Sequence, residues 1–258
     1  MKKTLYIVVL LIVGLMLGSC NKKANTEEAD KNKTEKVAKS KEELKKLVKE
    51  LDEECPYEVM GSSMQSIELK DEEVKITLIS DNYSKDVFEM WNKHKKVLSE
   101  SILNSMSYSF KKDEQLAPLL SKMMEAETGL VIEFKAPTGK KFTIKASADE
   151  VKKAKDANAK DVVKSGCKLT NAIVEESGVP INCSIEGNYY VVTMTTDCED
   201  YQKYLQYKEL FLSQIREELF SNNDALECLR ESGLGIKYII ANADTGEQFV
   251  SKIENDEL

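Results

Sequence analysis

The chain has 258 residues and a formal net charge of −8, and 41% of its residues are hydrophobic. This size suits one large globular domain or two small ones. The negative charge disfavours binding to nucleic acid and electrostatic attraction to anionic lipid. Arginine, the residue suited to bidentate recognition of phosphate and carboxylate groups, occurs only at Arg216 and Arg230. Sites of that kind are therefore not expected to be numerous.

The first residues have the pattern of a secretory signal peptide. Lys2 and Lys3 precede an apolar run from Leu5 to Leu17, and small residues follow that run. A basic start, an apolar core and small residues at the cut site are typical of such a peptide. The run is too short to span a bilayer, which takes about 20 residues. We therefore expect residues 1–19 to be removed on export.

A cysteine at the cut site indicates a lipid anchor. The string Leu17-Gly18-Ser19-Cys20 resembles the lipobox of bacterial lipoproteins. The resemblance implies cleavage before Cys20, diacylglyceryl attachment to its thiol and acylation of the new amino group. By the enterobacterial sorting pattern, Asn21 favours the outer membrane over the inner one, with periplasmic or surface exposure left open. The alternative is an ordinary signal peptide in which a cysteine happens to follow the cut.

The segment after this cysteine contains almost no large apolar residue. Residues 20–39 cannot bury a core and are expected to form a flexible tether. Ser40 and Glu43 then have the spacing of a capping box, and leucine and valine residues follow at helical spacing. We therefore expect the folded part to begin at residue 40.

The folded part contains the same pattern twice. Residues 114–151 align without a gap with residues 221–258, and residues 74–78 match residues 190–194. In each copy two hairpins of alternating residues enclose helical segments. This pattern predicts an α+β fold of two tandem repeats, each an antiparallel sheet of about four strands packed with helices. The layout resembles that of the two-repeat β-lactamase-inhibitory protein fold, in layout alone.

The same comparison sets the expected domain boundaries. Repeat 1 is expected at residues 40–150, a helical linker at residues 151–166 and repeat 2 at residues 167–258. Ser147 and Glu150 have the spacing of a capping box that would open the linker helix.

A long helix is expected after the first hairpin of each repeat. In repeat 1, apolar residues recur from Val87 to Ile102 at spacings of three and four, and His94 lies on this stripe. In repeat 2, Phe211 takes the position of His94. We therefore interpret His94, the only histidine, as a packing residue rather than a general base.

An aspartic-protease string occurs near the end of the chain. Asp244-Thr245-Gly246 matches the triplet in which two carboxylates share one proton. The first repeat has Pro137 in place of the aspartate, followed by the same Thr-Gly pair. Because a hairpin turn explains Thr-Gly in both repeats, we interpret the string as a turn.

Five cysteines remain besides Cys20, and their pairing is open. They are Cys55, Cys167, Cys183, Cys198 and Cys228. Export would place them where disulfides form, although an odd number leaves at least one thiol unpaired. Buried thiols that pack as small apolar residues are the alternative. The absence of a C-x-x-C motif disfavours a zinc site, and no metal or cofactor is expected.

Several tyrosines fall in the second repeat. Strand alternation and the helical stripe direct most of them inward, which leaves Tyr189 and Tyr207 as candidates for an exposed interaction surface. Core filling is the alternative for these two residues as well.

Together these features predict a lipid-anchored cell-envelope protein that acts as a non-catalytic interaction or binding module. Its expected partner is an envelope or extracellular protein. The lipobox, the lysine-rich tether and the repeated domain resemble envelope lipoproteins of Bacteroidetes-type bacteria. Two alternatives remain open: a small-ligand carrier with a cleft between the repeats, and a hydrolase that uses carboxylates alone and so leaves no motif.

Overall fold

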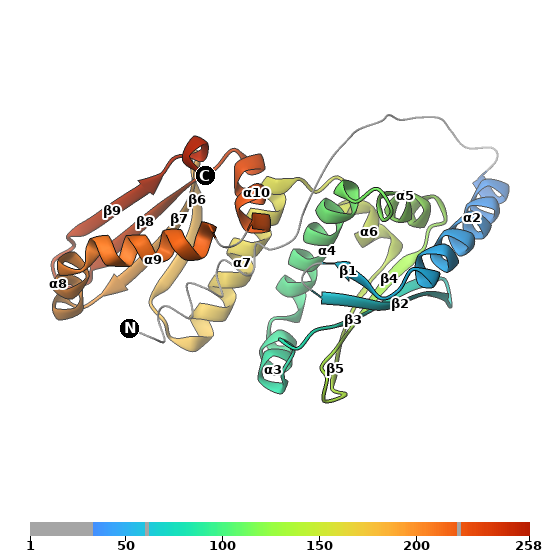
Figure 1. Ribbon diagram of the computed structural model, residues 1–258, viewed down its shortest axis with the longest axis horizontal. Helices are drawn as coiled ribbons and strands as arrows, with labels where there is room; N and C mark the ends of the chain where they lie inside the picture. The colour runs from blue at the N-terminus through green and yellow to red at the C-terminus, as the bar shows by residue number, and fades with distance from the viewer. Residues whose placement is uncertain (1–32, 60–61, 221–222) are drawn as a thin grey trace. The chain divides into compact units, whose positions relative to one another are not determined.

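The computed structural model describes residues 33–59, 62–220 and 223–258. These residues divide into two compact units, which meet in the sequence between Ala157 and Asn158. We call residues 33–157 the N-terminal unit and residues 158–258 the C-terminal unit. Each unit contains helices and one β-sheet, so the fold is mixed α+β (Figure 1).

The N-terminal unit contains a five-stranded sheet. Its elements are α2 (Lys33–Glu53), β1 (Tyr57–Val59), β2 (Ser62–Lys70), β3 (Glu73–Ile79), α3 (Lys85–Lys93), α4 (Lys95–Lys112), α5 (Ala117–Glu125), β4 (Gly129–Lys135), β5 (Lys141–Ala146) and α6 (Ala148–Ala154). The strands lie in the order β1-β2-β3-β4-β5. The short strand β1, which the sequence pattern did not indicate, pairs with the start of β2.

The C-terminal unit contains a four-stranded sheet in the order β6-β7-β8-β9. Its elements are α7 (Ala159–Ser177), β6 (Ile181–Glu186), β7 (Tyr189–Thr196), α8 (Cys198–Gln206), α9 (Lys208–Phe220), α10 (Asn223–Ser232), β8 (Gly235–Asn242), β9 (Gln248–Ile253) and the 3₁₀ helix η1 (Asn255–Glu257). Both units therefore follow the same order of helix, hairpin, three helices and hairpin.

The sheets are mixed, so the expectation of antiparallel sheets is wrong. The two hairpins of each unit are antiparallel, but β3 and β4 run parallel, as do β7 and β8. A parallel pair needs a long crossover connection, and the three helices between the hairpins provide it. They return the chain to the end of the sheet at which the preceding strand began. Alternation along a strand is the same in both directions, so the sequence pattern could not reveal this.

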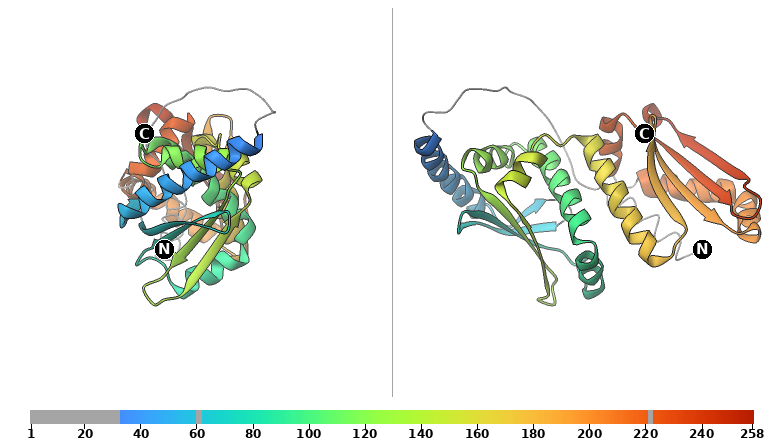
Figure 2. Two further views of the ribbon diagram at one scale, coloured as in Figure 1. Left: turned by 90° about the vertical axis from the view of Figure 1, so that its right-hand side faces the viewer. Right: turned by 180° about the vertical axis from the view of Figure 1, so that it is seen from behind.

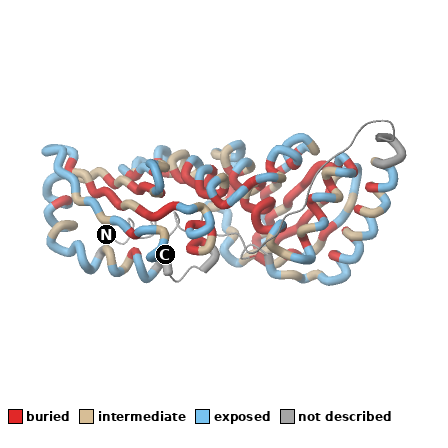
Figure 3. Tube along the Cα trace, turned by 90° about the horizontal axis from the view of Figure 1, so that it is seen from above, coloured by how far each residue is buried: buried red, intermediate tan, exposed pale blue. Residues whose placement is uncertain are grey.

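Helices cover one face of each sheet (Figure 2), and that face carries buried apolar residues. Ile76 and Ile132 lie side by side on β3 and β4 and are fully buried. Val192 and Tyr238 are paired in the same way on β7 and β8. Helix α2 packs on β2, and α7 packs on β6. Buried residues accordingly concentrate in the strands and in the helix faces that contact them (Figure 3).

Helix α2 begins before the expected start of the folded part. Ser40 lies inside α2 and is buried, with its hydroxyl 3.5 Å from Glu125 Oε2 on α5. Glu43 pairs with Lys122 on α5 at 2.6 Å. In a capping box, the side chains of both residues bond to the backbone. Here Ser40 and Glu43 contact side chains of α5 instead. The first turns of α2 therefore fall within the segment expected to be a tether.

The expected helical linker at residues 151–166 is divided between α6 and α7. Asn158 and Asp161 form a capping box at the start of α7, with both backbone-to-side-chain hydrogen bonds at 3.1 Å. The capping box predicted at Ser147 and Glu150 opens α6 and is confirmed. Each helix thus has its own N-terminal signal.

The long helix expected in each repeat is broken in two. His94 ends α3 with φ −107° and ψ 21°, and Tyr207 ends α8 with φ −108° and ψ 20°. Both residues still donate an N–H to the carbonyl four residues back, but a ψ near 20° departs from the helical value of about −42° and redirects the chain. His94 is therefore not in the middle of a helix, and its counterpart is Tyr207 rather than Phe211.

The gapless alignment of the two repeats is one residue out of register along β8. Leu130 on β4 pairs with Val74 on β3, and Ile236 on β8 pairs with Tyr190 on β7. Leu130 therefore corresponds to Ile236, whereas the alignment placed it opposite Lys237. A shift of one residue moves a side chain to the other face of a sheet. The additional residue of the C-terminal unit lies in the turn between β8 and β9.

Candidate functional site

The expected lipidation residue, Cys20, lies outside the described residues, as does the expected signal peptide. Among the helices of the described part of the chain, none is both long and apolar enough to cross a membrane.

The corner between α8 and α9 exposes two large apolar side chains. Tyr207 is 49% exposed and Leu210 is 55% exposed. We call these two residues the α8–α9 corner. Since Tyr207 stands at the break between the helices, neither helix covers its ring. The matching corner of the N-terminal unit holds His94 and Val97, which are both half-buried. Exposed tyrosine provides a large amphipathic contact area at a low entropy cost, so this corner is a candidate interaction surface.

Tyr189, the other predicted interaction residue, has partners within the C-terminal unit. Its hydroxyl donates to Glu254 Oε2 at 2.6 Å, and this hydrogen bond raises the pKa of Tyr189. The ammonium group of Lys252 lies 4.9 Å from the ring centre. The ring lies against Gly235, where an added Cβ would stand 3.1 Å from Tyr189 Cε1. Of the two tyrosines, Tyr207 is thus the more exposed.

Asp244 stabilises a turn and the start of a helix. Its N–H donates to Asn242 Oδ1 at 2.9 Å, and Gly246, with φ 75°, donates its N–H to Asn242 O at 2.9 Å. Asp244 Oδ2 accepts the N–H of Cys198, the first residue of α8, at 2.9 Å. A carboxylate at a helix N-terminus is stabilising. The interpretation of the Asp-Thr-Gly string as a turn is confirmed.

Two thiols meet between α7 and β6, a pair that the sequence pattern did not single out. Cys167 on α7 is 6% exposed and Cys183 on β6 is 3% exposed, and each thiol shifts the pKa of the other. Tyr190 donates its hydroxyl to Cys183 Sγ at 3.3 Å. Both cysteines are free thiols. Strand alternation could place Cys183 and Tyr190 on the same face, but no sequence signal brings a helix residue to them.

A side chain from α7 covers part of the free edge of β6. Asn171 Oδ1 accepts the Cys183 N–H at 2.6 Å, and Asn171 Nδ2 donates to Cys183 O at 2.7 Å. Asp52 of α2 likewise accepts the Ile67 N–H of β2 at 2.9 Å. Unpaired backbone groups on an edge strand invite association with other chains. The amide of Asn171 removes two such groups from the edge.

A groove of about 540 Å³ opens beside the two thiols, between α7 and β6. Cys167 and Cys183 lie in its wall, and half-buried Ile185 extends it along β6. Lys160 and Lys164, which are one helical turn apart, line its α7 side and are exposed. The groove thus combines two cysteines with a lysine-bearing rim.

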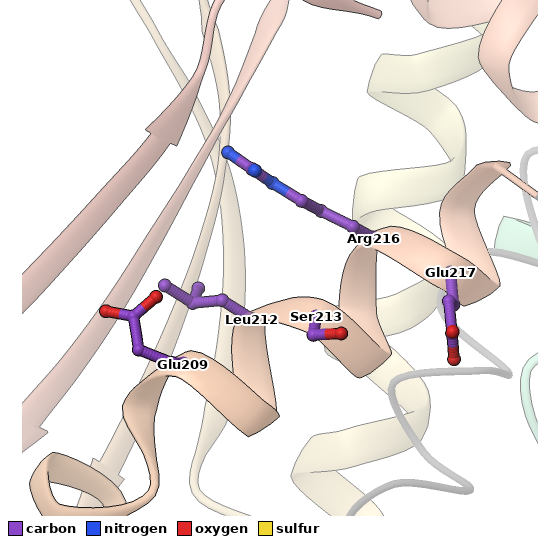
Figure 4. Close-up of a pocket in the computed structure, with 5 residues that line it drawn as sticks. All are labelled: Glu209, Leu212, Ser213, Arg216 and Glu217. Carbon is purple, nitrogen blue, oxygen red and sulfur yellow. The ribbon is translucent and has the colours of Figure 1, made fainter.

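A second hollow of about 500 Å³ lies along α9 (Figure 4). The described residues that line it all come from this one helix. Leu212 and Arg216 point toward the strands, whereas Glu217 points away from them. Binding pockets bring together polar groups from several elements, which a single helix does not do. We therefore treat this hollow as a surface groove.

The carboxylates whose pKa shifts clearly, within the described ranges, all have lowered values. They are Glu43, Glu72, Glu133 and Glu150. The side chain of Glu133 is 12% exposed and lies 3.1 Å from Lys135, 3.2 Å from Lys141 and 3.6 Å from Lys75. Burial opposes its ionisation, but the hydrogen bonds from Lys135 and Lys141 outweigh burial and lower its pKa. A carboxyl that acts as a general acid needs a raised pKa, so these four do not suit that role.

Across residues 33–59, 62–220 and 223–258, no three His, Cys, Asp or Glu side chains are grouped so as to hold a metal ion. Comparisons with protein-family models, with curated proteins and with solved structures give no match. The function is therefore inferred from the residues of the chain itself.

Proposed function

We propose that the protein is a lipid-anchored cell-envelope protein whose folded part is a non-catalytic binding module for an envelope or extracellular protein. The lipobox-like string ending at Cys20 supports attachment to the membrane, with the outer membrane favoured by Asn21. The exposure of Tyr207 and Leu210 at the α8–α9 corner carries the binding role. Tyrosine is enriched among the residues that dominate protein–protein interfaces.

We also propose that the two units are copies of one ancestral unit. Their common order of elements supports this, and so do contacts at matching positions. On the open face of the N-terminal sheet, Glu73 pairs with Lys145 at 3.1 Å. On the C-terminal sheet, Tyr189 and Lys252 hold the corresponding strand positions and form a cation–π contact. The side chain of Glu73 lies against Gly129, and that of Tyr189 lies against Gly235. Duplication would leave one copy free to acquire an exposed corner.

Replacing Cys20 tests the anchor. Because a Cys20→Ser chain has no thiol to receive the lipid, it should leave the membrane fraction when cells are fractionated. Cys198→Ser is the matched control, since Cys198 is exposed and is remote in the sequence from the lipobox-like string. The control should remain on membranes. Retention of Cys20→Ser on membranes would show that the anchor is not the lipid.

Site-specific photo-crosslinking in cells tests the binding role. A photoreactive residue at position 207 or 210 should yield one discrete crosslinked protein, and Leu210→Ser should weaken the crosslink from position 207. Position 202 is the control, because Gln202 is exposed on α8 outside the corner. Equal crosslinking from positions 202 and 207, or none from the corner, would count against this surface.

A further inference from the structure

Two cysteines, one on α7 and one on β6, line the same groove. Cys167 and Cys183 are both buried, and each shifts the pKa of the other. Asn171, one turn beyond Cys167 on α7, holds the backbone of Cys183 from both sides at 2.6 and 2.7 Å. These two hydrogen bonds join α7 to β6 at Cys183, one helical turn from Cys167.

The N-terminal unit has no thiols at the matching place. Asp52 accepts the N–H of Ile67, as Asn171 accepts the N–H of Cys183. Val48 lies four residues before Asp52, and Cys167 likewise lies four residues before Asn171. Both Val48 and Ile67 are buried. A valine and an isoleucine therefore fill the position in one unit, so packing alone does not call for two cysteines in the other.

The groove brings solvent next to both cysteines. Cys167 and Cys183 lie in its wall, and Lys160 and Lys164 are on its rim. Lysine side chains attract anions, so the rim favours an anionic disulfide over a neutral one. Cys228, by contrast, is fully buried and donates its S–H to Ala159 O at 3.7 Å.

We propose that Cys167 and Cys183 form a redox site, which closes to an intramolecular disulfide by exchange with a disulfide-bearing oxidant. The setting in which this occurs in cells rests on the proposed export, because disulfides persist in oxidising compartments. The pairing itself rests on the structure, because both cysteines line one groove and Asn171, on the helix that carries Cys167, bonds to the backbone of Cys183.

The reaction is a two-step thiol–disulfide exchange. Cys183 gives its proton to water, and its thiolate attacks one sulfur of the oxidant, which forms a mixed disulfide and releases one oxidant thiolate that takes up a proton. Cys167 then gives its proton to water, and its thiolate attacks the Cys183 sulfur and releases the second oxidant thiolate. The two cysteines lose two electrons in total, and the oxidant disulfide becomes two thiols.

The hydrogen bond that Tyr190 donates to Cys183 Sγ at 3.3 Å favours Cys183 as the first nucleophile. Hydrogen bonds from Cys167 and Tyr190 hold the pKa of Cys183 below its ordinary value, against the effect of burial. The hydrogen bond to Cys183, together with burial, raises the pKa of Cys167. Since the thiolate is the reactive form, Cys183 attacks first and Cys167 resolves the mixed disulfide.

Peptide mapping of the full chain tests the pairing. The chain is purified under dithiothreitol, exchanged into oxidised glutathione, alkylated and digested with trypsin and a glutamate-specific protease. We expect one linked species that joins residues 165–168 to residues 177–186, and its loss after reduction. Cys198→Ser is the matched control and should leave this species unchanged. Separate alkylation of Cys167 and Cys183, or linkage of either to another cysteine, would overturn the proposal.

Two conservative tyrosine variants test the role of the hydrogen bond to Cys183. Tyr190→Phe should slow closure by about fivefold at neutral pH, and the difference should shrink as the pH rises, because the thiolate then forms without the donor. Tyr238→Phe is the control, since Tyr238 is buried on the same sheet face. Equal rates at every pH for Tyr190→Phe and the unmodified chain would refute the assignment of Cys183 as the first nucleophile.

A paired variant guards against loss of folding. Cys167→Val with Cys183→Ile copies the residues of the N-terminal unit and should keep the circular dichroism spectrum of the reduced chain. Its melting temperature should not respond to oxidised glutathione, whereas that of the unmodified chain should rise. An identical rise in both would show that the stabilisation comes from elsewhere.

Discussion

Replacing Asn171 by alanine would remove the polar connection between α7 and the edge strand β6. Asn171 makes two hydrogen bonds with the backbone of Cys183, at 2.6 and 2.7 Å. Each lost hydrogen bond costs about 1 kcal/mol, and more where the group left behind stays dry. Since one donor and one acceptor are both left without their partner, we expect the free energy of unfolding of the C-terminal unit to fall by about 2 kcal/mol.

The aspartate variant separates the two hydrogen bonds. Asn171→Asp can still accept the Cys183 N–H, as Asp52 accepts the Ile67 N–H, but it cannot donate to the Cys183 carbonyl. We therefore expect a loss of about 1 kcal/mol, half of that for alanine. With a denaturant slope of about 1.5 kcal/mol/M, the alanine variant should unfold at a urea concentration lower by about 1.3 M.

Urea titration and amide hydrogen exchange would measure these effects. Glu175→Ala is the control, because Glu175 is exposed on the same helix and its truncation should cost less than about 0.5 kcal/mol. The amide of Cys183 should exchange faster in Asn171→Ala than in the control. If Asn171→Ala were as stable as Glu175→Ala, the amide of Asn171 would not be what joins the helix to the strand.

Three further changes have defined outcomes. Because the folded pKa of Glu133 lies below its usual value of 4.5, its stabilising effect is present above that pH and is lost as the pH falls through the folded pKa. Glu133→Gln should therefore flatten the fall in melting temperature below pH 5; an unchanged pH profile would contradict this. Asp244→Ala removes the acceptor for the Cys198 N–H and should lower the free energy of unfolding by about 1 kcal/mol, as measured by thermal unfolding. An unchanged melting temperature would contradict this. Gly235→Ala would place a Cβ 2.6 Å from Ile253 O, so we expect a loss of about 2 kcal/mol by urea titration; wild-type stability would show that the strands can move apart.

The sequence was sufficient for features set by local chemistry. Alternation located β3 and β7, and the Ser147–Glu150 spacing located the start of α6. Thr-Gly pairs located the turns of both second hairpins, because glycine readily adopts the positive φ found at Gly139 and Gly246. Each of these signals depends on neighbours in the chain alone.

Features set by distant contacts could not be predicted in this way. Ser40 has the pattern of a cap, but a partner on α5 keeps it inside a helix. The apolar stripe runs through His94 without a break, since a change of ψ at one residue leaves the pattern intact. The pairing of Cys167 with Cys183 depends on how α7 lies on β6, and neither cysteine has a sequence neighbour that signals it.

The parallel pair at the centre of each sheet has a consequence for the order of folding. Each hairpin joins strands that are adjacent in sequence, whereas Val74 must find Leu130, and Tyr190 must find Ile236, across three helices. Contacts between residues far apart in the chain form slowly, because the intervening loop must be closed first. Hairpins and helices can therefore form early, while the two halves of each sheet join last. Each unit acquires its complete core only in that final step, so a chain that ends within the crossover helices would have no finished sheet.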